Sequence, residues 1–336
     1  MREPGVSLFE TFSAVRGQDR AVAQLGNELS SQRIHHAHLF IGPEGVGKST
    51  VALAWASRLL CPRATGIDAC GSCPSCLKLK KGSHPDLMQV GPDGNTIKIE
   101  QVRAISSATR YQPNEGRWRV IIIERAETMG EAAANALLKT LEEPGGSSLF
   151  VLLSAHANLL LPTTRSRCIA VPFGALSFEA TETVLAQRGI EETMIPTLAR
   201  LSRGSPGRAV ELANSSVLDE RSDVIRAFVR VARGDVFAGL ELAEWAANGN
   251  DRALLGERIL IWMGILRDVT VLSSTQRPDL VHNQDEQRGI EALSQALSPS
   301  RVSAWIEAME RARGRLRGNV NLRLIMESLV LEFSED

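Results

Sequence analysis

The stretch Ala37-His38-Leu39-Phe40-Ile41-Gly42-Pro43-Glu44-Gly45-Val46-Gly47-Lys48-Ser49-Thr50 decides the fold of this chain. Its first five residues form an apolar run of strand length, and residues 51–60 beyond it show a helical pattern. Between the two lies the complete pattern GxxxxGK[ST], in the strand-to-helix context that this phosphate-binding motif requires. The stretch therefore predicts an α/β fold organised around a nucleotide site.

The residue types in this loop suit a polyphosphate. Glycines let backbone N–H groups turn inward around phosphate oxygens, and the start of the following helix adds partial positive charge. Lys48 is expected to reach the β- and γ-phosphates, and the Ser49 hydroxyl is expected to ligate Mg²⁺. We expect ATP or ADP with Mg²⁺ to contact the following residues: Gly42, Gly45, Gly47, Lys48, Ser49 and Thr50. A chance glycine-rich turn is the alternative, which the flanking strand and helix disfavour.

Apolar runs of strand length recur through the first half of the chain, with longer helical patterns between them. These runs are Ala37–Ile41, Leu87–Val90, Arg119–Ile123, Leu149–Ser154 and Ile169–Phe173. Such alternation predicts a parallel sheet with crossover helices over residues 1–173. The strand-like runs then cease. We expect a small helical domain over 174–214 and a larger all-helical domain over 215–336, interrupted by a polar loop near 273–288.

Length and composition limit the classes of function. With 336 residues, two or three domains are expected. A formal net charge of −1 and an aromatic content of 4% argue against a protein that holds nucleic acid alone, by bulk charge or base stacking. We find no apolar signal core at the N-terminus and no apolar run long enough to span a bilayer, so a cytoplasmic location is expected.

The second acidic motif of a phosphate-loop ATPase departs from its usual form. A strand normally ends in Asp, which holds Mg²⁺, and many families follow it with a Glu that activates water. Here the apolar strand ends in Glu124-Arg125, and a guanidinium cannot accept a proton. Glu127 lies nearby at an offset that does not fit the role. The chain is therefore expected to bind nucleotide and to hydrolyse it weakly or not at all; Glu124 could also be a solvated strand end.

Four of the five cysteines form one cluster, Cys61, Cys70, Cys73 and Cys76. Each C-x₂-C step brings two thiolates to one ion from a tight turn, and four sulfurs complete a tetrahedral Zn²⁺ site. With every ligand supplied by protein, the site is expected to be structural. Free thiols and an iron–sulfur cluster are the alternatives. Cys168 stands apart and is expected to be a core residue.

Taken in order, these features resemble the bacterial DNA polymerase III clamp loader, within the AAA+ superfamily. The resemblance rests on Phe12-Ser13-Ala14-Val15-Arg16-Gly17-Gln18, on His35-His36-Ala37-His38-Leu39-Phe40, on the cysteine cluster, and on residues 134–144, Ala-Asn-Ala-Leu-Leu-Lys-Thr-Leu-Glu-Glu-Pro. It implies an AAA+ domain, a helical lid domain and a helical collar domain that holds a ring of five subunits together. ATP is expected at the interfaces between subunits.

The resemblance also implies roles for single residues. Ser166-Arg167-Cys168 matches the source of the family's arginine finger, so Arg167 is expected to act on ATP bound by a neighbour. Ser154 matches the first-sensor position, where the family usually has Thr or Asn, and Arg208 matches the second-sensor arginine. Each has a simpler reading: Arg167 as a surface arginine, Arg208 as a helix-start residue, Ser154 as a strand end.

Two kinds of subunit remain, the tau/gamma motor and the delta-prime stator. The departure at Arg125, the pattern Ser154-Ala155-His156-Ala157, and the end of the sequence after the helical domain favour the stator; the intact phosphate loop favours the motor. The implied partners are tau/gamma and delta subunits, and through them the sliding clamp and primed DNA, within a DNA-directed DNA polymerase complex. An independent AAA+ ATPase acting on DNA is a third reading. Lys98 and Arg103 are weak candidates for phosphate contacts, and a solvated helix face is the simpler reading of both.

Overall fold

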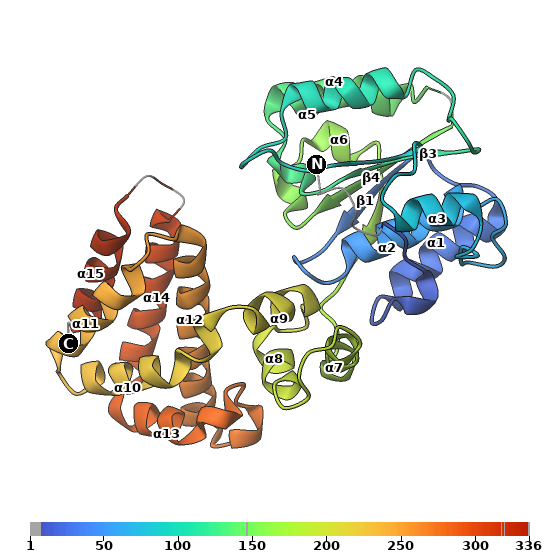
Figure 1. The fold of residues 1–336 in the computed structure, drawn as a ribbon. Helices are drawn as coiled ribbons and strands as arrows, with labels where there is room; N and C mark the ends of the chain where they lie inside the picture. The colour runs from blue at the N-terminus through green and yellow to red at the C-terminus, as the bar shows by residue number, and fades with distance from the viewer. Residues whose placement is uncertain (1–7, 146, 317, 319, 335–336) are drawn as a thin grey trace. The chain divides into compact units, whose positions relative to one another are not determined.

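The computed structural model describes residues 8–145, 147–316, 318 and 320–334, and they form two compact units. The first unit comprises the described residues up to Val184 together with Gly204–Arg208. The second comprises Leu185–Arg203 and the described residues from Ala209 onward. Two helices, α7 (Phe178–Gln187) and α9 (Pro206–Ala213), cross the division (Figure 1). The three-domain division expected from the sequence therefore stays a prediction.

The first unit is built on a five-stranded parallel sheet in the order β2-β3-β4-β1-β5. Its strands are β1 (Ala37–Ile41), β2 (Leu87–Val90), β3 (Arg119–Ile123), β4 (Ser148–Ser154) and β5 (Ile169–Pro172). Its helices are α1 (Asp19–Ser31), α2 (Lys48–Leu60), α3 (Pro74–Lys80), α4 (Ile99–Ala108), α5 (Glu131–Glu142) and α6 (Pro162–Arg165), with 3₁₀ helices at Phe12–Ala14, Ala126–Thr128 and Ala157–Leu159. This confirms the predicted α/β fold class.

Helices cover both faces of the sheet, which is why its central strands are mostly apolar (Figure 1). Successive side chains of a strand point to opposite faces, so each strand contributes side chains to a core on either side of the sheet. On one face, Ile122 and Val151 pack with Trp55 of α2. On the other, Ile121 and Phe150 join a core that receives the apolar sides of α4 and α5.

The second unit is helical in its described part. Its helices are α8 (Ile195–Leu201), α10 (Arg221–Ala232), α11 (Val236–Ala247), α12 (Arg252–Thr275), α13 (Gln287–Ala296), α14 (Pro299–Arg315) and α15 (Leu322–Phe333), with 3₁₀ helices at Ser216–Leu218, Pro278–Leu280 and Gln284–Glu286. Four buried aromatic rings gather at the centre: Phe228 lies 5.4 Å from Trp262 and 5.5 Å from Trp305, and Trp305 stacks on Phe333 at 4.3 Å between centroids.

The strand predictions hold to within one residue, and the predicted helical C-terminal part is confirmed. The polar loop was predicted to begin near residue 273, but in the structure α12 continues to Thr275. The helix ends there because Gln276 adopts a left-handed φ of 54°. Among the described helices, none combines the length and apolar character needed to cross a membrane.

Candidate nucleotide site and metal centre

The phosphate loop lies between β1 and α2 at the carboxyl edge of the sheet. Gly45 and Gly47 have positive φ values of 72° and 101°, which only glycine adopts freely, and this is why the motif needs them. Lys48 is buried and its Nζ donates to the carbonyl oxygens of Gly42 and Pro43, at 2.5 and 2.6 Å. Ser49 and Thr50 follow in the first turn of α2. The sequence-predicted contacts to phosphate are thus brought together in one loop.

A strap formed by Gly204–Arg208 packs directly on this loop. The Gly207 N–H donates to the Gly45 carbonyl at 2.9 Å, and the Ser205 hydroxyl donates to the Glu44 carbonyl at 2.8 Å. A Cβ on Gly207 would lie 2.7 Å from the Cα of Gly45, so both glycines are needed for this approach. The contact brings Arg208, the candidate second sensor, beside the phosphate loop.

Gln18, from the N-terminal box, is a second tie to the phosphate loop. Its buried side chain donates to the carbonyls of Val46, at 3.0 Å, and Gly174, at 2.8 Å. A buried amide that lost its partners would cost about 1–3 kcal/mol of folding free energy, so these two hydrogen bonds hold the segments together. Gln18 therefore joins the loop to the segment that leaves β5.

The structure brings Glu127, which the sequence offset had set aside, toward the nucleotide site. Arg125 adopts a left-handed φ of 49°, so the chain turns sharply after β3 and Arg125 is exposed. Glu127 Oε1 accepts from the Ala155 N–H at 3.1 Å, whereas Oε2 is buried with no hydrogen-bond partner among the described residues. Burial lowers the pKa of Lys48, and the nearby carboxylates of Glu127 and Glu44 offset part of that shift. Glu127 is thus an acidic group near the loop lysine.

Glu124 and Ser154 end neighbouring strands at the same edge of the sheet. The Glu124 N–H donates to the Val90 carbonyl at 2.8 Å, which fixes its backbone beside β2. Ser154 is buried; its carbonyl accepts from the Gly42 N–H at 3.2 Å, and its hydroxyl accepts from the His156 N–H. Both candidates therefore lie at the carboxyl edge, where the phosphate loop begins.

Arg167 lies at the opposite edge. It precedes β5, whose Ile169 pairs beside His38, so Arg167 sits at the amino end of the parallel strands. The phosphate loop begins beyond the other end of β1, and five extended residues span about 16 Å. The Arg167 guanidinium donates to the Thr163 carbonyl at 2.7 Å and pairs with Glu142 at the end of α5. An arginine so placed faces away from the nucleotide site of its own chain.

The four clustered cysteines meet at one point. Their sulfurs all lie within 4.8 Å of one another, with Cys61 to Cys73 at 3.8 Å and Cys70 to Cys76 at 4.0 Å. These separations are too long for disulfides. Sulfurs held about 2.3 Å from a common ion at tetrahedral angles lie about 3.8 Å apart, which agrees with this cluster. The residues present could therefore hold a metal ion.

In the absence of a bound metal ion, the clustered cysteine thiols differ in pKa. Burial raises the pKa of Cys61 and Cys76, whereas hydrogen bonds from the backbone N–H groups of Ser72 and Cys73 lower the pKa of Cys70 to about 6. Backbone N–H groups also point at sulfur: that of Cys76 at Cys73 and that of Cys70 at Cys61, at 3.5 and 3.4 Å. A bound cation would stabilise all four thiolates together.

The cysteine module is attached to the rest of the unit by polar contacts. Asp68 Oδ1 accepts from the Phe12 and Ser13 N–H groups at 2.6 and 3.3 Å. Ser75, between two ligands, donates to the carbonyl of Leu60 at the end of α2 and lies 2.9 Å from Nε2 of His84. The module thus connects the end of the phosphate-loop helix to the N-terminal box.

The two candidate DNA contacts are ordinary surface residues. Lys98 precedes α4 and forms an exposed ion pair with Asp93, at 2.5 Å. Arg103 is exposed on α4 itself. Both side chains are exposed to solvent, which agrees with the solvated-face reading.

Two family models match the chain. One, described as DNA polymerase III, delta subunit, covers residues 17–177, and the other, described as DNA polymerase III, delta subunit, C terminal, covers residues 215–335. The first spans the sheet and the phosphate loop, and the second spans most of the helical second unit.

Several relatives resemble the chain along much of its length. The DNA polymerase III subunit delta' of Pseudomonas aeruginosa is 31% identical over 92% of this chain and 95% of the relative. That of Bacillus subtilis is 32% identical over 95% of this chain and 96% of the relative. The DNA polymerase III subunit tau of Escherichia coli is 32% identical over 75% of this chain and 39% of the relative. Similarity to delta' thus extends through both units.

Proposed function

Because this chain belongs to the DNA polymerase III delta-prime subunit family, we propose that it is the stator subunit of a clamp loader. In this role it joins tau/gamma and delta subunits in a ring of five, which loads the sliding clamp onto primed DNA. It contributes an arginine to a neighbour and little hydrolysis of its own. The single observation that carries the proposal is the similarity to delta' subunits through both units, and the opposed placement of the phosphate loop and Arg167 on one sheet supports the role of that arginine.

The opposed placement supports action in trans. An arginine finger must approach the γ-phosphate, and Arg167 precedes the strand at whose far end its own phosphate loop begins. Only an adjacent subunit can therefore present an ATP to it. A permanently charged, fork-shaped donor is suited to γ-phosphate oxygens, and such arginines contribute about 10³–10⁵ in rate. Glu142, its present partner, would orient Arg167 or release it when the neighbour docks.

The nucleotide role is binding with slow turnover. Lys48, Ser49 and the loop glycines supply a phosphate cradle, and Mg²⁺ would neutralise phosphate charge beside Ser49 and the acidic side chains. The position after Glu124 carries Arg125, which is exposed and cannot take a proton from water. Glu127 and Glu124 are then the carboxylates available to the site.

Zinc is the metal that best suits the cysteine cluster. Four thiolates with tetrahedral spacing and no open position are typical of structural zinc. The ion would hold α3 and the preceding loop in place, and through Asp68 and Ser75 it would steady the N-terminal box and the end of α2.

A tau/gamma-type motor is the second candidate, favoured by the intact loop and by similarity to the tau subunit over 75% of the chain. The two candidates differ in whether ATP is hydrolysed at the chain's own phosphate loop. A motor that keeps its catalytic groups turns over ATP with help from a neighbour's arginine, whereas a stator needs no turnover at its own site.

The test is reconstitution with the other loader subunits, the clamp and primed DNA. Arg167→Ala should leave assembly intact, since an exposed pair with Glu142 is worth less than about 1 kcal/mol. It should lower the ATPase rate of the complex partially, because only one of several sites borrows this arginine. Arg165→Ala, an exposed arginine two residues away, is the matched control.

One outcome would overturn the trans-acting role of Arg167, and another would overturn the stator assignment. One is a normal ATPase rate in an Arg167→Ala complex that assembles fully and has clamp and DNA present. The other is steady-state hydrolysis by the isolated chain that disappears in Lys48→Ala, since this would make the chain a motor.

A further inference from the structure

Two segments that carry the family resemblance meet at one ion pair. The residues 134–144 run along α5 and past its end, and Ser166-Arg167-Cys168 follows α6. Glu142, the last residue of α5, pairs with the guanidinium of Arg167. In the proposed function Arg167 acts on a neighbour's ATP, whereas Glu142 has no fixed part. The pair therefore links the first of these segments, which so far has no function, to the arginine.

Helix stability does not explain a glutamate at this position. The carboxyl end of a helix carries partial negative charge, so an acidic side chain there is unfavourable and a cation is favourable. Glu142 ends α5, and Glu143 follows it as the C-cap. Lys139 in the last turn and the guanidinium of Arg167 offset this repulsion. The end of α5 thus holds Arg167 at a place where the charge of the arginine is neutralised.

The backbone is fixed on both sides of the pair, and the two side chains are exposed. The Leu141 carbonyl, beside Glu142, lies 2.9 Å from Nε2 of His36, which precedes β1. On the other side, the Arg167 N–H donates to the Thr164 carbonyl at 3.3 Å. The side chains of Arg167 and Glu142 are 32% and 48% exposed. Rotation of these two side chains is therefore enough to open the pair without unfolding either helix.

Both terminal nitrogens of the Arg167 guanidinium are engaged in this structure. Nη1 donates to the Thr163 carbonyl at 2.7 Å, and Nη2 donates to the Glu142 carboxylate. A bidentate contact with a phosphate uses at least one terminal nitrogen, because each edge of the guanidinium fork includes one. The carboxylate and the phosphate are also both anions, so they repel each other at short range. A γ-phosphate therefore competes with Glu142 for the arginine.

We propose that Glu142 is a latch, which holds Arg167 until the ATP of a neighbouring subunit displaces it. With the latch closed, the guanidinium is shared between the Glu142 carboxylate and the Thr163 carbonyl. When the two subunits close on each other, the γ-phosphate takes the place of the carboxylate, and Glu142 turns toward solvent. Glu142 is thus a positioning residue that acts through Arg167. This inference rests on the proposed function and adds the regulation of its arginine.

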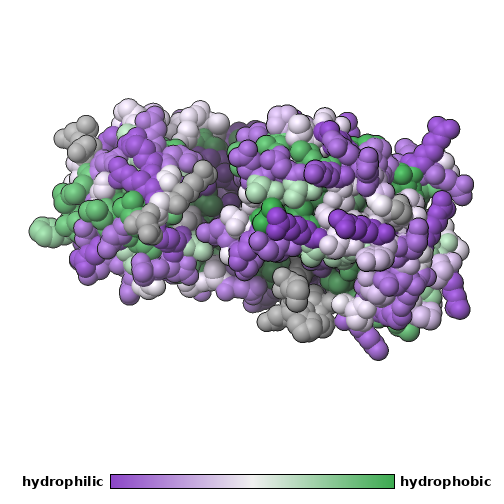
Figure 2. Space-filling view, turned by 90° about the horizontal axis from the view of Figure 1, so that it is seen from above, coloured by the Kyte–Doolittle hydropathy of each residue, from purple (hydrophilic) through white to green (hydrophobic). Residues whose placement is uncertain are grey.

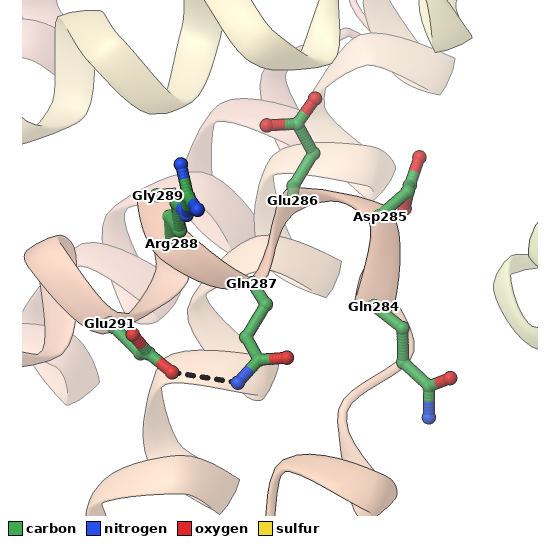
Figure 3. A pocket seen from close by; sticks show the side chains of 7 residues that line it. All are labelled: Gln284, Asp285, Glu286, Gln287, Arg288, Gly289 and Glu291. Atoms are coloured by element: carbon green, nitrogen blue, oxygen red, sulfur yellow. Dashed lines mark hydrogen bonds between the residues drawn. The ribbon is translucent and has the colours of Figure 1, made fainter.

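Two arginines of the second unit that serve packing are held differently. The side chains of Arg221 and Arg258 are 7% and 8% exposed, and they pair with Asp285 and Glu220. Asp285 is drawn in Figure 3 among the residues that line a polar hollow. The first unit, in contrast, shows many hydrophilic residues on the side of α4 and α5, as seen from above in Figure 2. Because water and salt screen an exposed pair such as that of Arg167, it opens at little cost.

The test measures ATPase rates of the reconstituted loader with and without the clamp and primed DNA. Glu142→Gln should raise the rate without clamp and DNA by about twofold, and it should change the rate with both of them much less. The rise is small because an exposed ion pair shifts an equilibrium by about fivefold at most, and only one of several sites uses this arginine. Glu143→Gln is the matched control: it removes the neighbouring charge, keeps the latch and should leave both rates at the parent values.

A double variant, Glu142→Gln with Arg167→Ala, separates a latch from an effect on the helix. Because the latch acts only through Arg167, the double variant should have the same rates as Arg167→Ala alone. A glutamate that merely stabilised the end of α5 would change the rates in both backgrounds. Thermal unfolding and assembly of each variant check that the fold and the complex are intact.

The outcomes separate the latch from the proposed function. If the Arg167→Ala complex hydrolyses ATP at the parent rate, the trans-acting role is wrong, and the latch with it. If Arg167→Ala lowers the rate but Glu142→Gln leaves the rate without clamp and DNA unchanged, the proposed function stands and the latch is wrong. The latch is also wrong if Glu142→Gln lowers the rate, which would show that the carboxylate orients Arg167 for the reaction, or if the double variant exceeds the rate of Arg167→Ala.

Discussion

Glu127 owes its position to the backbone of a neighbouring residue. In the sequence after β3, Arg125 occupies the position where a second acidic residue is usual. Glu127 comes two residues after that position. The left-handed turn at Arg125 and the 3₁₀ helix Ala126–Thr128 then direct Glu127 toward β4. An unpartnered carboxylate oxygen in a buried position is unusual, because burying it costs free energy. A bound Mg²⁺ or its water would supply the missing partner.

We therefore predict that Glu127→Gln weakens binding of ATP with Mg²⁺ by about tenfold, the effect of losing one charged contact. Binding measured with EDTA present should change much less. Glu44→Gln is the matched control, because Glu44 also lies near Lys48 but is exposed. Equal affinities of Glu127→Gln and the parent chain for the magnesium complex would contradict this role.

At the scale of the element, the cysteine module shows how a short helix is maintained. The helix α3 has seven residues, too few to be stable alone in water. Cys73 caps its start, Pro74 occupies its first position, and Ser75 ties it to the end of α2. The Cys73 sulfur thus caps the helix directly, and a shared ion would couple it to Cys61, Cys70 and Cys76.

We predict one tightly held Zn²⁺ per chain in protein purified without chelator. Cys70→Ser should remove most of it and loosen the module, because structural zinc is coupled to local folding. Elemental analysis and limited proteolysis between residues 61 and 81 measure the two effects. Cys168→Ser is the control: burial raises the pKa of that thiol to about 12, it lies outside the cluster, and its loss should leave the metal in place. A metal-free parent chain would end the zinc proposal.

At the scale of the whole molecule, the chain keeps two separate cores of different kinds. The first unit buries a sheet between two layers and carries the phosphate loop, the cysteine cluster and Arg167. The second buries Phe228, Trp262, Trp305 and Phe333 among helices. The candidate nucleotide site and the candidate metal centre therefore both lie in the first unit.

We predict two transitions in calorimetric unfolding. Saturating ATP with Mg²⁺ should shift only one of them to higher temperature. At a ligand concentration one hundred times the dissociation constant, the free energy of unfolding of that unit should rise by about 2.7 kcal/mol. A strong chelator that removes zinc should lower the temperature of the same transition. Phe237→Asp should shift neither transition appreciably, because Phe237 on α11 is 78% exposed. A single transition that responds to all three treatments would show that the units unfold together.

The sequence alone determined the fold class, because strand-length apolar runs with helical patterns between them allow few arrangements other than a parallel sheet. Ala37–Ile41 and Arg119–Ile123 were predicted to the residue, since strands inside such a sheet bury side chains on both faces and so read as apolar runs. It also determined the phosphate loop and the cysteine cluster, whose chemistry resides in spacing within a single segment.

Tertiary structure decided what depends on distant segments. The packing of Gly207 on Gly45 joins residues far apart in the chain, and no local pattern encodes that contact. The placement of Glu127 depended on one backbone dihedral, and the separation of Arg167 from Lys48 depended on the direction in which β5 pairs with β1. Likewise, the pattern of α11 is apolar on two sides, and only packing shows which side the core covers and which side stays exposed.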